Sequence, residues 1–269
     1  MKRKERMILL GLIVAGVLVS FISEKEEKTN PKDYTERAFG ISLEMVYVEG
    51  GTFRMGATAE QGNDAEDDEY PVRTVKIDGY YIGKYEVTEA QWNAVMGKKK
   101  SWDSLSDGCS MDGVDWYAAQ AFCEKLSEQT GKRYVLPTEA QWEYAARGGN
   151  KSRQYKYAGS NDIEDVAWYK KNTDGFYLPF CMQSKKKRKK ANELGLYDMS
   201  GGVYEWCLDW YGIYDKEDTD NPQGPTSGEW RVIRSGCFSR RAVECRVSCR
   251  IKAHPEQYTC GFRVVCISE

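Results

Sequence analysis

Residues 192–210 read Asn-Glu-Leu-Gly-Leu-Tyr-Asp-Met-Ser-Gly-Gly-Val-Tyr-Glu-Trp-Cys-Leu-Asp-Trp, and this stretch decides the fold. It combines patterning over the length of a helix, a Gly-Gly break, and acidic residues interleaved with aromatic ones. Two more motifs accompany it: Met-Val-Tyr-Val-Glu-Gly-Gly-Thr-Phe at 45–53 and Leu-Pro-Thr-Glu-Ala-Gln-Trp-Glu-Tyr-Ala-Ala-Arg-Gly-Gly at 136–149. Because no low-complexity linker follows residue 45, the 269 residues favour one large domain over two.

The three motifs, in this order, resemble the sulfatase-modifying-factor (formylglycine-generating-enzyme-like) domain, and the resemblance runs from about Glu44 to Val265. It implies a variant of the C-type lectin fold, an α+β, irregular, loop-rich single domain. Periodicity alone indicates only α+β. We therefore expect a signal peptide or membrane anchor at 1–23, a polar tether at 24–43 and the domain itself at 44–267.

The first 23 residues have the layout of an export signal, since four basic residues within 1–6 precede an uncharged stretch from Met7 to Ser23. This stretch is at the short edge of what spans a bilayer core of about 30 Å, so a cleaved signal and a retained anchor both stay open. No Ala-x-Ala-like site follows, which favours an uncleaved anchor with its positive end inside. We expect a cell-envelope protein, either secreted or attached to the membrane through this segment.

The charge balance argues against nucleic acid as a partner, because 39 basic and 41 acidic side chains leave no strong global field. The basic run at 185–190 and the acidic stretch at 64–69 are both interpreted as solvated loops. Nine cysteines leave at least one thiol unpaired. Two of them, Cys123 and Cys207, are expected to be small buried hydrophobic residues.

Capping and periodicity predict three helices and several short strands. Capping boxes begin helices at Thr88 and Thr138, and Asp115 caps a helix between them. The apolar stripe of that middle helix is Trp116, Ala119, Phe122, Cys123 and Leu126. Glycines end these helices near Gly97, Gly131 and Gly148. Alternation predicts strands at 45–53, 72–82, 231–234 and 261–266.

The acidic residues of the 192–210 motif are hard oxygen donors that suit calcium. The resemblance implies a structural calcium bound in part through this motif, with Glu205 as the metal ligand. Gly202 stands where the family usually has Asn, which removes one side-chain oxygen. The alternative is that these acids cap and hydrogen-bond the loops. The aromatic residues of the region, Tyr197, Tyr204, Trp206, Trp210 and Tyr211, form either the core, which we favour, or a binding platform.

Enzymes of the resembled family convert a substrate cysteine to formylglycine with a Cys-x4-Cys pair that binds copper. The pattern Arg250, Pro255 and Gly261-Phe262-Arg263 matches the family and places that pair on Ala242 and Val247. Neither residue can ligate a metal, so copper is not expected and no catalytic residue is assigned. Cys245 and Cys249 stand in a different register. The single histidine, His254, cannot build an iron site or a convincing triad and is interpreted as a surface residue.

Residues 231–265 form a candidate ligand-display segment. The family pattern is kept at anchor positions: Arg231, Arg234, Gly236, Ala242, Arg246, Arg250, Pro255 and 261–263. The residue types between the anchors are chemically arbitrary. This combination resembles the variable-region proteins of diversity-generating retroelements, which use this domain to present a mutable binding face; ordinary drift on an exposed loop is the alternative. The candidate ligand-binding residues are Phe238, Ser239, Arg240, Arg241, Ile251, Lys252, His254, Gln257 and Tyr258.

The sequence thus predicts an exported or anchored, non-catalytic, lectin-like binding protein whose partner is a protein or a glycan. Two rival functions stay open. One is an oxidase of the formylglycine-generating type that acts on protein cysteine with thiols outside the family register. The other is a structural component of an envelope complex.

Overall fold

The computed structural model describes residues 32–97, 108–176, 188–258 and 260–267. The expected signal or anchor at 1–23 and the first part of the expected tether lie outside these ranges. Within them, no helix has both the length and the apolar character needed to cross a membrane.

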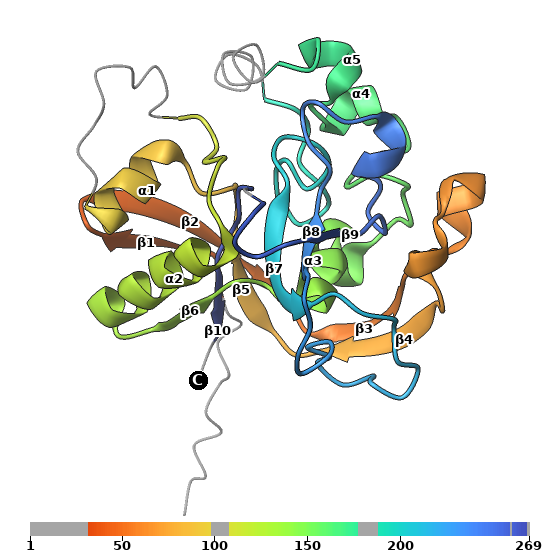
Figure 1. Cartoon of the computed structure of the whole chain (residues 1–269), viewed down its shortest axis with the longest axis horizontal. Helices are drawn as coiled ribbons and strands as arrows, with labels where there is room; N and C mark the ends of the chain where they lie inside the picture. Colours follow the sequence, from red (N-terminus) through yellow and green to blue (C-terminus); the bar gives the residue numbers. More distant parts are fainter. Residues whose placement is uncertain (1–31, 98–107, 177–187, 259, 268–269) are drawn as a thin grey trace, which may run out of the picture. The chain divides into compact units, whose positions relative to one another are not determined.

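A five-stranded antiparallel sheet, in the order β1-β2-β5-β10-β6, forms one side of the domain (Figure 1). Its strands are β1 Tyr34–Ala38, β2 Ile41–Val48, β5 Tyr80–Gly83, β6 Arg133–Val135 and β10 Val265–Ile267. The last strand in sequence, β10, lies between β5 and β6. The pairing of β10 with β5 and β6 therefore holds the end of the C-terminal segment, residues 231–265, in the large sheet.

The prediction of a polar tether is wrong for residues 34–43, which form β1 and the start of β2. The two strands are joined by a tight turn in which Phe39 and Gly40 both have positive φ. Along β1 the exposed side chains of Thr35 and Arg37 alternate with more buried ones. An edge strand with one solvated face is polar at every second position, so its composition resembles that of a tether.

The three predicted helices are confirmed as α1 Glu89–Met96, α2 Trp116–Thr130 and α3 Glu139–Ala146. Thr88 and Thr138 each complete a capping box, and the Asp115 carboxylate accepts a hydrogen bond from the backbone N–H of Ala118. The first two helices end at glycines in the left-handed conformation. The whole predicted stripe of α2 is buried, as is Cys207. In Figure 1, α1 and α2 lie beside the large sheet, whereas α3 lies beside a smaller one.

The smaller sheet has three antiparallel strands, β7 Glu205–Trp210, β8 Arg231–Arg234 and β9 Ile251–Ala253. The last six residues of the 192–210 motif therefore form the strand β7 and not a helix. Gly201 and Gly202, with φ of 77° and 76°, turn the chain just before it. Trp206 is fully buried and Tyr204 is 5% exposed, so these two aromatic residues belong to the core rather than to a platform.

The rest of the domain consists of a hairpin and short helical turns. The hairpin pairs β3 Gly51–Met55 with β4 Arg73–Ile77, so the predicted strands at 45–53 and 72–82 each divide between two strands. The turns are η1 Ala59–Asp64, η2 Asp67–Glu69, η3 Gly149–Lys151, α4 Ile163–Val166, α5 Lys170–Thr173 and η4 Ala242–Cys245. This architecture confirms the α+β, loop-rich fold class.

Candidate ligand-binding site

Four buried arginines attach the C-terminal segment to the body of the domain. They are Arg234, Arg246, Arg250 and Arg263, and none is more than 5% exposed. Arg234 bridges Glu139 and Glu143 at 2.7 Å each, while Arg250 grips Glu139 through Nε and Nη2. Burial by itself would raise the pKa of Glu139, but the two guanidinium charges hold it below its usual range. These four arginine anchors of the sequence pattern are thus ionic attachments.

The ion pair between Glu69 and Arg246 fixes η2 against the C-terminal segment, and it corrects the prediction that 64–69 is simply a solvated loop. The Glu69 carboxylate is fully buried and accepts hydrogen bonds from both Nη atoms of Arg246 and from Ser248 Oγ. Burial would raise the pKa of Glu69, but these donors lower it. Glu69 and Arg246 are 177 residues apart in sequence, so the pair brings two distant segments together.

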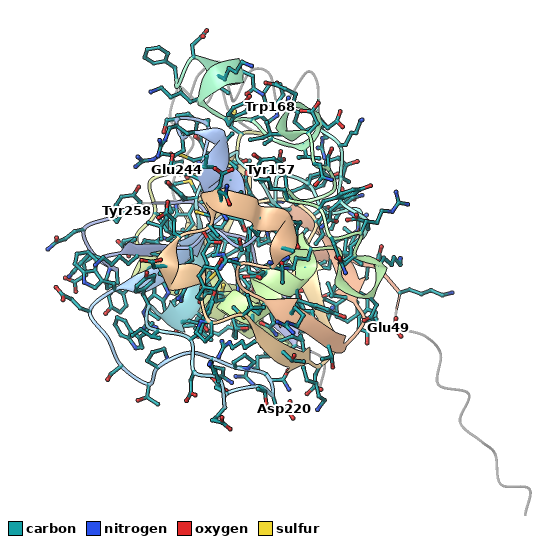
Figure 2. The ribbon with its side chains drawn as sticks, turned by 90° about the vertical axis from the view of Figure 1, so that its right-hand side faces the viewer. Glu49, Tyr157, Trp168, Asp220, Glu244 and Tyr258 are labelled. Carbon is teal, nitrogen blue, oxygen red and sulfur yellow. The ribbon has the colours of Figure 1, made fainter. Side chains whose placement is uncertain are left out.

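A cavity of about 420 Å³ opens beside this ion pair. Figure 2 looks onto this side of the domain and shows Glu244 on the blue C-terminal turn above the orange turns that contain η2. One wall comes from η2, the other from η4 and the start of β9. The lining residues are Glu66, Asp67, Asp68, Arg241, Val243, Glu244, Arg246, Cys249, Arg250 and Ile251.

The predicted ligand-binding residues divide between this cavity and two neighbouring patches. Arg241 and Ile251 line the cavity. Arg240 lies over the Tyr204 ring and hydrogen-bonds Tyr258, whose ring also contacts Tyr204. Lys252 and His254 flank the Trp230 ring. The structure therefore brings only part of the predicted set together.

The exposure of these residues is mixed. Arg240, Arg241, Lys252 and Gln257 are exposed, as a display face requires. The others are half-buried: Phe238, Ser239, Ile251, His254 and Tyr258. His254 is partly exposed, with its ring edge-on to Trp230 and Nδ1 accepting a hydrogen bond from the backbone N–H of Glu256.

The two positions on which the resemblance places the family's cysteine pair lie next to the cavity and hold Ala242 and Val247. Ala242 begins η4, and Val247 is fully buried in an apolar cluster. Cys245 is also fully buried. Cys249 lines the cavity, yet burial and the charges of Glu69 and Asp68 raise its pKa to about 12. A thiol that stays protonated is a poor nucleophile and a poor metal ligand.

The Glu205 carboxylate does not fit the predicted calcium site. Arg263 Nη2 donates to Oε1 at 2.5 Å, while Arg263 Nε and Trp142 Nε1 donate to Oε2 at 2.6 and 2.8 Å. Both oxygens of this fully buried group are thus committed to protein donors. In the described ranges, no three His, Cys, Asp or Glu side chains are grouped so as to hold a metal.

Sequence reasoning missed the acidic wall of the cavity, formed by Glu66, Asp67 and Asp68. The run of acids was visible, but it carried no sign that Glu69 is buried against Arg246. Capping of η2 by the reciprocal contacts of Glu66 and Glu69 was the one local signal that the stretch is ordered. Val243 and Glu244, on the opposite wall, lie between the anchors, where the sequence carries no sign of a cavity.

Comparison with known proteins settles the family. The model of the sulfatase-modifying factor enzyme 1-like domain matches residues 33–267. The chain belongs to this family. It is 32% identical over 240 residues to a Paenibacillus barcinonensis protein named chaperone protein LppX, covering 73% of this chain and 79% of that one. It is 27% identical over 288 residues to the formylglycine-generating enzyme of Mus musculus, covering 81% of this chain and 74% of the enzyme.

Among solved structures, this member of the sulfatase-modifying factor family is similar to Treponema denticola variable protein 1. The TM-score is 0.71 at 29% identity, and the match covers 88% of this chain and all of that one. The C-type-lectin-like fold and the resemblance to variable proteins are thereby confirmed. The chain spans only 42% of the length of the chlamydial relatives named serine/threonine-protein kinase pkn1.

Proposed function

We propose that this chain is a non-catalytic binding protein of the sulfatase-modifying factor family, and that the cavity beside η2 with the exposed side chains around it holds a protein ligand. One observation carries the proposal. Ala242 and Val247 occupy the catalytic register, and the thiol that lines the cavity, Cys249, has its pKa raised to about 12. The site keeps its place in the fold but lacks a thiolate for copper chemistry.

Three further findings support a binding role in the cell envelope. The exposed side chains of 240–257 project from a segment whose anchors are buried, which is the arrangement a display face needs. The similarity to a variable protein and to a chaperone favours a protein as the ligand. Cys109 is disulfide-bonded, which is typical of an oxidising compartment and supports export through the segment at 1–23.

The proposal predicts no formylglycine-generating activity. Purified protein incubated with Cu(I), oxygen and a Cys-x-Pro-x-Arg peptide should leave the peptide cysteine unmodified by mass spectrometry. A formylglycine-generating enzyme assayed in parallel is the positive control. Turnover by this chain that disappears in Cys249→Ser or Cys245→Ser would show that thiols outside the family register are catalytic, and the binding proposal would then be wrong.

A further inference from the structure

We infer that the cavity beside η2 binds a cationic side chain, lysine or arginine, carried by the protein ligand. This rests on the proposed function and names the chemistry of the same site.

The charges on the cavity walls are unbalanced. Four carboxylates line it, from Glu66, Asp67, Asp68 and Glu244. Arg246 and Arg250 also line it, but both are ion-paired with buried glutamates: Arg246 with Glu69, and Arg250 with Glu139, which Arg234 shares. Arg241 is the remaining base, and its side chain is 75% exposed and 3.9 Å from Glu244. Among the ion pairs of the described residues, none involves Glu66, Asp67 or Asp68, although Asp68 accepts a hydrogen bond from the Tyr211 hydroxyl.

An acidic surface by itself does not mark a site, but this one is a wall of a cavity with a second, different wall. Half-buried Val243 and Ile251 line it too, and they suit the methylene stem of a lysine or arginine whose charged end reaches the acids. Five of the ten lining residues come from between the anchors of the display segment: Arg241, Val243, Glu244, Cys249 and Ile251. The wall predicted to meet a ligand thus faces the acidic wall.

The residues that line the cavity also favour a cationic side chain over a glycan as the ligand. Sugar rings are commonly held by the flat faces of aromatic side chains. In the part of the chain that the structure describes, no aromatic residue is among those that line the cavity. Its volume lies within the range of about 300–1,000 Å³ that is usual for ligand pockets. A single extended cationic side chain with an aliphatic stem matches both walls.

The test measures binding of fluorescein-labelled tetralysine, with labelled tetraglutamate as the matched probe, by fluorescence anisotropy at low and high salt. We expect the full chain to bind tetralysine, more weakly at high salt, and not tetraglutamate. Glu66→Gln with Asp67→Gln should weaken tetralysine binding roughly fivefold, because two partly screened ion pairs are lost. Glu124→Gln with Glu128→Gln is the control, since both residues are exposed on α2 and outside the cavity. It should leave binding unchanged.

A second pair of variants fills the cavity from inside. Val243→Lys places a tethered cation between the walls and should compete with tetralysine, whereas Val243→Gln should not. Equal binding of both probes, equal weakening by the α2 control, or no difference between the two Val243 variants would overturn the inference. If both probes bind equally and the peptide cysteine in the activity assay stays unmodified, only this inference is refuted. Conversion of the peptide cysteine would instead refute the proposed function.

Discussion

Along residues 231–263, buried arginines alternate with exposed side chains. The buried arginines attach the segment to the domain, whereas the exposed side chains face solvent. Arg234, Arg246, Arg250 and Arg263 point inward and are held by glutamates from distant parts of the chain. Arg240 and Arg241, of the same chemistry, are exposed, although Arg240 also lies over the Tyr204 ring. The difference is the partner: each inward guanidinium is ion-paired with a buried glutamate, whereas Arg241 has only Glu244, at 3.9 Å. A segment attached in this way can change its exposed side chains while its path stays fixed.

The largest expected effect is the loss of an inward arginine. Arg263→Ala leaves the fully buried Glu205 carboxylate without its cation, which should lower the free energy of unfolding by about 3–5 kcal/mol. Arg241→Ala is the matched control on the solvent side and should cost about 0.5 kcal/mol or less. Urea denaturation of the three proteins measures both. Similar costs for the two variants would mean that the inward and outward arginines are not different in kind.

The second prediction concerns a buried carboxyl that has no arginine partner. Burial, followed by the nearby charge of Glu139, raises the pKa of Asp209 to about 7, against about 3.9 in an unfolded chain. The folded protein therefore holds a proton that the unfolded chain releases from about pH 4, so stability falls as pH rises through this window up to about 7. Between pH 5 and 8 the loss should be roughly 2–3 kcal/mol.

Asp209→Asn removes this titration but retains an oxygen that can accept the hydrogen bond from the Glu139 backbone N–H. Its free energy of unfolding, measured by urea denaturation at several pH values, should fall less between pH 5 and 8 than that of the parent chain. Glu217→Gln, an exposed change, should keep the parent's slope. Parallel curves for the parent chain and Asp209→Asn would show that the carboxyl is already ionised at pH 5.

The third prediction concerns the exposed and half-buried side chains of the same segment. Alanine at Arg241, Lys252 or Gln257 should each change stability by no more than about 0.5 kcal/mol, because all three are exposed. Ile251 and Tyr258 are half-buried and should cost about 1 kcal/mol each, from partial loss of apolar burial. Thermal and urea unfolding of the five variants check this order. If the exposed three cost as much as Arg263→Ala, the segment is core and cannot serve as a display face.

The contrast between local and distant contacts also explains which features of the fold could be predicted from the sequence. Helix starts and ends depend on neighbouring residues, so the caps at Thr88, Asp115 and Thr138 were predictable. The anchors of the C-terminal segment were found through the family pattern, and their burial is confirmed for the arginines. The strand β1 was missed because an edge strand with a solvated face is polar in composition.

The cavity was not predictable, because it depends on contacts between residues far apart in sequence. Nothing near Glu69 shows that its partner is Arg246. Without that pair, Glu66 to Asp68 are simply acids in a loop, and Val243 and Glu244 are filling between anchors. The donors at Glu205 were unpredictable for the same reason: the motif suggested a calcium ligand, and the folded chain supplies Arg263 and Trp142 as hydrogen-bond donors to this carboxylate.

The smallest expected effect is therefore the response to calcium. Since both Glu205 oxygens accept hydrogen bonds inside the protein, direct coordination would require Arg263 to leave a fully buried position. Protein stripped with chelator should keep the same melting temperature when millimolar calcium is added. A calcium site at Glu205 would instead stabilise the fold by about 2.7 kcal/mol at a hundredfold excess over the dissociation constant. A saturable rise in melting temperature that Glu205→Gln abolishes would show that calcium, and not only the guanidinium, neutralises this carboxylate.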